Sequence, residues 1–158
     1  MEQLDSRFIE LLQDLGKNSG LDSLSSTILA ILYVQPEEIA MDSIAEQTGY
    51  SLASISNKSS MLISLGLIIK KKKPGTKKIF LFMEKDFLKL FKDELLRKKQ
   101  LNIIIAKEKV PSIIKEFKSK AKTMADKEKL KIIEDYYSKV LLFEKVINEM
   151  VQRIDTIK

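Results

Sequence analysis

At 158 residues, with 44% apolar and 32% charged residues and a formal net charge of +6, the chain suits one globular domain, or a small domain with a long helical extension. The absence of cysteine and histidine excludes disulfides, thiolate chemistry, and the commonest metal ligand and general base. Without a glycine-rich phosphate-binding motif or an apolar run of the roughly 20 residues that span a bilayer, we expect a cytoplasmic protein that is not an enzyme and binds no membrane, cofactor or metal.

The first 50 residues predict three helices. Apolar residues recur at helical spacing up to Gly16, which predicts an amphipathic first helix. A second helix is expected from about Ser23 to Tyr33, because its apolar residues keep the same period and Pro36 follows. The third and shortest helix is predicted from Met41 to Thr48, and Gly49 suits the left-handed conformation that often ends a helix.

A fourth helix follows at once, from Leu52 to Leu65. Ser51 is a typical N-cap residue, and Tyr50 and Ile55 flank it at the positions of a hydrophobic staple. Two helices joined by a tight turn that contains glycine are the signature of a helix-turn-helix. The fourth helix is interpreted either as a recognition helix that reaches DNA or as a serine-rich core helix. The helical period places four residues on its outward face, namely Ser54, Asn57, Lys58 and Met61.

A β-hairpin is predicted after Gly66, which ends the fourth helix. The apolar run 67–69 begins one strand, and the sequence 74–76, Pro-Gly-Thr, is typical of a turn. Residues 77–82 form the return strand, with Phe80 and Phe82 on one face. A hairpin that packs against a helix-turn-helix is a wing.

Positive charge is concentrated in this part of the chain. Between Tyr50 and Met83 there are seven lysines and no acidic residue, whereas the rest of the chain has 21 basic residues (28 − 7) against 22 acidic ones. A patch of one sign is typical of a surface that meets polyphosphate. Lysines on an edge strand also discourage edge-to-edge aggregation, and both roles can hold at once. The seven are Lys58, Lys70, Lys71, Lys72, Lys73, Lys77 and Lys78.

The chain from Glu84 onward is predicted to be helical and of mixed charge. Pro111 interrupts the helical pattern, either as a kink or as the first residue of a new helix. Before it, apolar residues keep helical spacing at Phe87, Phe91, Leu95, Leu101 and Ile105.

The last helix is predicted from about Asp126 to Ile157 and carries two apolar stripes. The first stripe comprises Ile133, Tyr137, Val140, Ile147, Val151 and Ile154, and the second comprises Ile132, Tyr136, Phe143, Val146, Met150 and Ile157. So wide an apolar face on a helix of ~30 residues needs more partner surface than one small domain offers. We therefore infer a homodimer with the first stripe at its interface. Alternatively, Tyr136, Tyr137 and Phe143 line an effector cavity.

The order of these elements, together with four short motifs, resembles the MarR superfamily, and most closely its GbsR-like branch, which includes archaeal members. The motifs are Leu29-Ala30-Ile31-Leu32-Tyr33, Ile44-Ala45, the serine-capped stretch Ser51–Ser56, and Leu62–Ile68 leading into the wing. The likeness covers most of the chain, with the last third matching as amphipathic helix. It implies a mainly α fold, with a winged helix-turn-helix and its small β-hairpin wing over residues 1–83 and long dimerisation helices over residues 84–158.

The resemblance further implies a dimeric transcriptional regulator that binds double-stranded DNA. The recognition helix, about residues 52–65, would enter the major groove, and the lysine-rich wing, residues 70–80, would meet the DNA backbone or the minor groove. The DNA-facing positions that it implies are Ser51, Ser54, Asn57 and Lys58 on the helix and Lys72, Lys73, Thr76, Lys77 and Lys78 on the wing.

One departure from this family pattern is the absence of arginine from the recognition helix and the wing. The common bidentate contact of arginine to guanine is therefore missing, and selectivity is expected to lean on Asn57, Lys58 and DNA shape. Two other interpretations stay open: a winged-helix module whose lysines bind an acidic protein partner, and a helical scaffold. The operator, the target genes, a small-molecule effector and the direction of regulation do not follow from the sequence.

Overall fold

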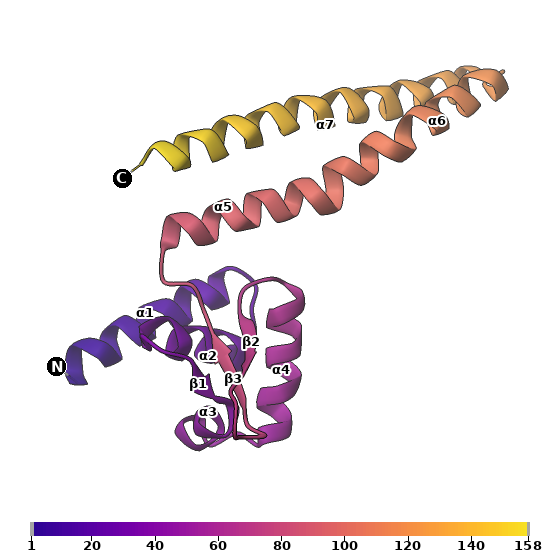
Figure 1. Ribbon diagram of the computed structural model, residues 1–158. Coiled ribbons are helices and arrows are strands. Elements are labelled where there is room, and N and C mark those ends of the chain that lie inside the picture. Colours follow the sequence, from indigo (N-terminus) through magenta and orange to yellow (C-terminus); the bar gives the residue numbers. More distant parts are fainter. Residues whose placement is uncertain (1, 158) are drawn as a thin grey trace. The chain divides into compact units, whose positions relative to one another are not determined.

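The computed structural model describes residues 2–157, and their side chains from Ser6 onward, as two compact units that divide after Phe87 (Figure 1). The first unit contains α1 (Glu2–Asn18), α2 (Ser23–Val34), β1 (Ile39–Ala40), α3 (Met41–Thr48), α4 (Leu52–Ser64), β2 (Ile69–Lys72) and β3 (Ile79–Phe82). The second contains α5 (Phe87–Lys98) except for its first residue, the π-helical segment η1 (Lys99–Ile104), α6 (Ile105–Lys120) and α7 (Met124–Thr156). The predicted helix-turn-helix, α3 and α4, and the predicted wing, β2 and β3, are both present, so the fold is a winged helix-turn-helix.

A tight turn joins α3 to α4. Gly49 has a φ of 71°, and its N–H donates to the carbonyl of Ala45 at 2.9 Å, which closes α3. Glycine suits this position because a side chain at such a φ is strained. Ser51 then caps α4, since its Oγ accepts a hydrogen bond from the Ser54 N–H at 3.2 Å. Both caps were predicted from the sequence, and they determine where α4 begins.

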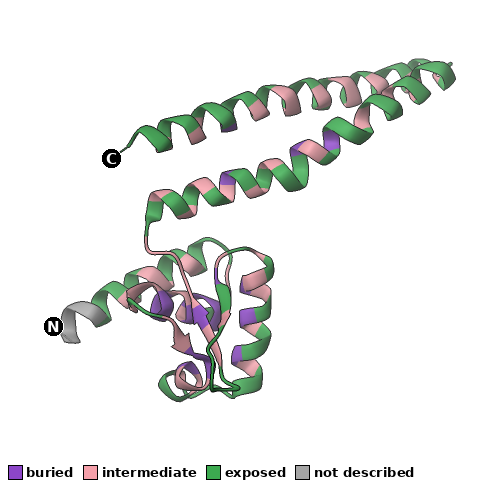
Figure 2. Ribbon diagram, viewed as in Figure 1, coloured by how far each residue is buried: buried purple, intermediate pink, exposed green. Residues whose placement is uncertain are grey.

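The core of the first unit lies among α2, α3, α4 and the sheet. Figure 2 shows the buried residues on the inner sides of these elements and exposed residues along the outer side of α4. Ile55 and Leu62 anchor one face of α4 in this core, so the opposite face stays in solvent. The residues of the core cluster are Leu24, Ile28, Leu32, Met41, Ile44, Ile55, Leu62, Ile68 and Leu81.

The wing belongs to a three-stranded antiparallel sheet with the strand order β1-β3-β2. Leu81, at the centre of β3, pairs with Ile39 on one side and Lys70 on the other and is fully buried. Phe80 and Phe82 share the other face of the strand, as the alternation of side chains predicts. Strand β1 was not predicted, because two residues are too few to show a strand period.

The second unit is a helical hairpin in which α7 returns along η1 and α6. A capping box begins α7: Thr123 Oγ1 accepts from the Asp126 N–H at 3.1 Å, and Asp126 Oδ2 accepts from the Thr123 N–H at 3.0 Å. Pro111 lies inside α6, so it does not begin a new helix. Within residues 2–157, the structure has no helix that is long and apolar enough to cross a membrane.

The π-helical segment η1 changes which side chains face α7. An uninterrupted helical period placed Leu101 and Ile105 in line with Leu95, but they are 51% and 44% exposed, whereas Ile103 and Ala106 are buried. Hydrogen bonds in a π-helix run to the fifth residue, so each turn holds more residues than an α-helical turn. The apolar pattern therefore changes phase at η1, which the sequence period did not anticipate.

The first apolar stripe of α7 packs within its own chain. Ile147 is fully buried in a cluster with Leu95 and Ile103. Val140, Val151 and Ile154 are partly buried around this cluster, and Ile133 and Tyr137 are half-buried. Ile147, which was predicted at a dimer interface, is thus enclosed within its own chain, whereas the other five members of the stripe keep part of their surface exposed.

The second apolar stripe of α7 is the exposed one. Ile132, Tyr136, Phe143 and Val146 are 69%, 53%, 51% and 46% exposed. The sequence alone does not tell which of the two stripes is buried, because that depends on how the neighbouring helix packs. Met150 of this stripe is partly buried against the hairpin cluster, and the other members remain accessible to a partner.

Candidate nucleic-acid interface

The predicted DNA-reading residues of α4 lie at its N-terminal half. Ser51 and Asn57 are exposed, and Ser54 and Lys58 are half-buried. The hydroxyls of Ser51 and Ser54 lie 2.9 Å apart within the N-cap, so the two side chains orient each other. Asn57 makes no side-chain hydrogen bond to any residue that the structure describes, which leaves its amide free to donate and accept.

Helix α4 and the wing border a common cleft of about 220 Å³. The wing contributes Lys77 and Lys78, α4 contributes Leu52 and Ser56, and α3 contributes Asp42 to a lining that also includes Met41 and Ile79. The fold therefore brings the two elements predicted to meet DNA to one cleft. Ser56 was not predicted, because nothing in the sequence separates it from the other serines of α4.

The turn of the wing is shaped by Gly75 and Thr76. Gly75 has a φ of 78°, a conformation that a glycine adopts without strain. Thr76 Oγ1 accepts a hydrogen bond from the Lys78 N–H at 3.1 Å. The hydroxyl of Thr76, predicted to face DNA, thus also helps to form the turn.

Four of the seven lysines in the patch are bound by carboxylates of the same unit. The pairs, from Nζ to carboxylate oxygen, are Lys58–Asp22 at 3.0 Å, Lys71–Glu38 at 3.2 Å, Lys73–Glu38 at 3.1 Å, and Lys78–Asp42. All three carboxylates precede Tyr50 in the sequence. A count of charges between Tyr50 and Met83 therefore missed them, and only the fold brings them to the patch.

Glu38 is the carboxylate that binds two lysines, and its side chain is only 16% exposed. Hydrogen bonds from Lys73 and then Lys71 lower the pKa of Glu38 to about 2. A hydrogen bond from Lys78 lowers the pKa of Asp42 as well. Both groups are therefore ionised at neutral pH and cancel part of the positive charge of the patch.

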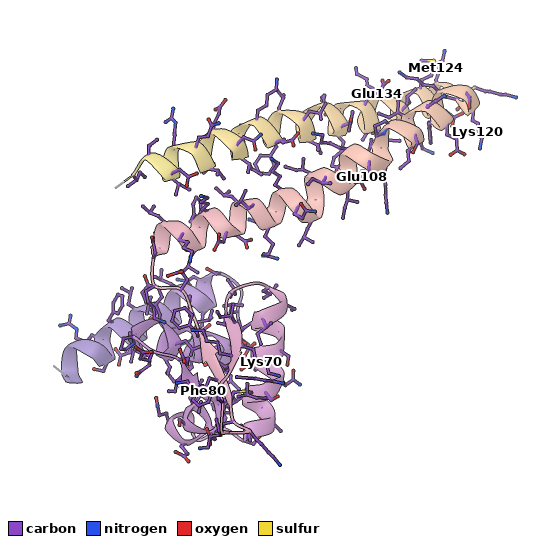
Figure 3. All side chains as sticks on the ribbon, in the orientation of Figure 1. Lys70, Phe80, Glu108, Lys120, Met124 and Glu134 are labelled. Atoms are coloured by element: carbon purple, nitrogen blue, oxygen red, sulfur yellow. The ribbon has the colours of Figure 1, made fainter. Side chains whose placement is uncertain are left out.

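The remaining lysines, Lys70, Lys72 and Lys77, form no ion pair within the described part of the chain. Together with the three carboxylates, the patch carries a formal charge of +4 (seven lysines minus Asp22, Glu38 and Asp42). The charge available to a polyanion is therefore smaller than the sequence indicates. The free lysines come from both sides of the wing turn, and Figure 3 labels Lys70 on β2.

Two of the bound lysines also contact aromatic rings of β3. Lys71 Nζ lies 4.4 Å from the centroid of Phe82, and Lys73 Nζ lies 4.6 Å from that of Phe80, which is labelled in Figure 3. These are cation–π distances. Each amine is thus held by both Glu38 and a ring, which restricts its motion more than an ion pair alone would.

Comparisons with known proteins establish a fold and no family. The chain is similar to the crystal structure of a transcriptional regulator, with a TM-score of 0.69, 17% identity, and coverage of 97% of this chain and 99% of that one. It also matches a zinc-responsive MarR family member, Lactococcus lactis ZitR, with a TM-score of 0.39, 19% identity, and coverage of 90% and 99%. No protein-family model matches the chain, and no curated protein matches it in sequence.

Proposed function

We propose that this chain is a DNA-binding transcriptional regulator that acts as a homodimer. The observation that carries the proposal is the common cleft between α4 and the wing, which is lined from both elements and lies in a lysine-rich patch. A helix that anchors one face in the core and offers small polar side chains on the other is suited to the major groove. The lysines of the wing suit the phosphate backbone or the minor groove beside it.

Within this proposal, the contacts have separate roles. Ser51, Ser54 and Asn57 approach base edges and the nearest phosphates, and Asn57 has the only amide among them. The lysines supply affinity that depends little on sequence, because phosphates are the same at every base pair. Since the patch contains no arginine, discrimination between sequences draws on DNA shape as well as on base contacts.

The proposed dimer uses the second stripe of α7. Ile132, Tyr136, Phe143 and Val146 form a row of large, exposed apolar side chains. Exposed apolar patches of this kind typically mark interaction surfaces. The partner helix of the hairpin adds further exposed apolar residues, Leu101, Ile105 and Ile113, so the hairpin as a whole offers apolar surface for a second copy.

Membership of the MarR superfamily, and of its GbsR-like branch, is part of the proposal and rests on the sequence motifs that lead into α4 and the wing. The similarity in fold to a transcriptional regulator supports this assignment at the level of architecture. Such a regulator works in the cytoplasm and recognises a DNA site of two half-sites, because its dimer axis relates two recognition helices.

The proposal is tested by duplex binding of the purified protein over a series of salt concentrations. Counterion release makes the logarithm of affinity fall linearly with the logarithm of salt concentration. Selection from genomic fragments should then yield a palindromic consensus if the protein acts as a symmetric dimer. An absence of duplex binding, or binding that does not depend on salt, would favour a module that binds another protein.

A further inference from the structure

The carboxylates that bind the lysines of the patch face the same amines that a DNA phosphate would contact. We propose that Glu38, together with Asp42, competes with DNA phosphate for these lysines and so limits the affinity of the protein for non-specific DNA. This inference rests on the proposed function and adds to it the residues that set the strength of non-specific binding.

The fold holds Glu38 beside the wing from a separate element. Glu38 directly precedes β1, and β1 pairs with the central strand β3 through Ile39 and Leu81. The carboxylate therefore keeps its place relative to Lys71 and Lys73, one on β2 and the other just after it. Because Phe80 and Phe82 also contact these amines, the lysines are positioned before any ligand arrives.

The charge balance explains how this arrangement limits binding. A lysine that leaves Glu38 for a phosphate leaves behind an ionised carboxylate next to the DNA. That carboxylate either repels the backbone or takes up a cation, which offsets the counterion released from the phosphate. Glu38 therefore offsets about one of the two phosphate contacts of Lys71 and Lys73, and Asp42 offsets that of Lys78. Lys70, Lys72 and Lys77 contribute in full to the salt-dependent affinity.

An alternative is that these ion pairs serve folding alone. Exposed lysine–carboxylate pairs usually contribute little to stability. The two explanations differ in one observable, the slope of log affinity against log salt. A structural role does not change this slope as long as the variant stays folded.

The decisive variant is Glu38→Gln, which keeps the shape of the side chain and removes its charge. Glu37→Gln is the matched control, because Glu37 is the adjacent residue, is exposed, and forms no ion pair within the described chain. Affinity for one random-sequence duplex would be measured for both variants and the wild type across the same salt series. Thermal unfolding by circular dichroism would verify that each protein is folded.

We expect Glu38→Gln to steepen the slope by about 0.9, because the single charge that offsets one of the two phosphate contacts of Lys71 and Lys73 is removed, and each phosphate contact contributes about 0.9. Glu37→Gln should change the slope by less than half of that. Asp42→Asn, which frees Lys78 alone, should steepen it by about 0.9. In a protein that already carries Lys71→Ala and Lys73→Ala, the Glu38→Gln change should leave the slope as it is.

The outcomes separate this inference from the proposed function. If the wild type binds duplex with a salt-dependent affinity, but Glu38→Gln and Glu37→Gln have the same slope, competition by Glu38 is wrong. If Glu38→Gln does not fold, Asp42→Asn decides by the same criterion. If the wild type shows no salt-dependent duplex binding at all, the proposed function fails, and this inference fails with it.

Discussion

Lys58 Nζ lies 3.0 Å from Asp22 Oδ2, and this ion pair links the outer side of α4 to the N-terminus of α2. Asp22 is also the N-cap of α2, since its Oδ1 accepts from the Ser25 N–H at 3.1 Å and its Oδ2 accepts from Ser25 Oγ at 2.7 Å. One carboxylate thus stabilises a core helix and holds a lysine that we assign to DNA. Changes at the two residues can be distinguished by their effects on stability.

Asp22→Ala is expected to lower the free energy of unfolding by about 1 kcal/mol at pH 7, because α2 loses its N-cap. Although burial opposes the shift, the hydrogen bonds of Ser25 and Lys58 outweigh it and lower the pKa of Asp22 from 3.8 to about 2. A carboxylate whose pKa is lower in the folded state than in the unfolded state stabilises the fold at pH values above its unfolded-state pKa. This contribution is lost as the pH falls through the folded-state pKa. Urea unfolding between pH 4 and pH 2 should therefore show the difference between variant and wild type shrinking.

Lys58→Met is the control for this prediction, because it keeps the cap and removes only a partly exposed ion pair. Its cost should stay below about 1 kcal/mol. If the free energies of unfolding of wild type and Asp22→Ala fall by the same amount between pH 4 and pH 2, the pKa of Asp22 is not lowered by its partners.

Ser59→Ala is expected to leave stability unchanged or to raise it by about 1 kcal/mol. Ser59 is 1% exposed, and its hydroxyl has no hydrogen-bond partner among the residues that the structure describes. Removing a buried polar group without a partner removes its desolvation cost. Ser51→Ala, on the same helix, should instead destabilise by about 1 kcal/mol through loss of the N-cap. A loss of stability in Ser59→Ala, measured by urea unfolding, would indicate a hydrogen bond that the structure lacks.

Tyr136→Glu combined with Phe143→Glu is expected to convert the proposed dimer to a folded monomer. Charges on the exposed stripe of α7 would have to be buried at the interface, which is costly without a partner charge. Sedimentation velocity measures the mass, and circular dichroism verifies the helices. Gln152→Glu, an exposed change elsewhere on α7, serves as the control and should remain dimeric.

Ile147→Ala tests whether the first stripe of α7 packs inside the hairpin. Because Ile147 is fully buried within the hairpin, this change should destabilise the chain by about 2–5 kcal/mol through the cavity that it leaves. Two results together would place the interface on the first stripe instead. The double variant at Tyr136 and Phe143 would remain dimeric, and the Ile147→Ala protein would be stable but monomeric.

Asn57→Ala is expected to lower the preference for a selected operator over a random duplex while non-specific binding survives. A good base contact is worth about 1–3 kcal/mol of discrimination, which corresponds to a loss of roughly 5- to 150-fold in the ratio of affinities. Ser54→Ala should have a smaller effect of the same kind, because its hydroxyl already takes part in the N-cap. The ratio would be measured at one salt concentration, and an unchanged ratio in both variants would move sequence selectivity to DNA shape.

Features that depend on neighbours along the chain could be predicted from the sequence. The caps at Gly49 and Ser51 and the wing turn at Gly75 each rely on contacts within a few residues. Apolar periods likewise located the helices and the buried face of α4, because one helix turn relates residues three and four apart. These local signals were sufficient for the winged helix-turn-helix.

Features that depend on residues far apart in the sequence were decided only by the tertiary structure. Lys58 and Lys71 find their carboxylates 36 and 33 residues away, so a charge count within the patch overestimated its free charge. Which stripe of α7 packs inside the hairpin depended on the phase of η1 and on where Leu95 and Ile103 pack. Ion pairing and core packing are set by distance in space, and a sequence period carries no information about which distant side chain will fill that space.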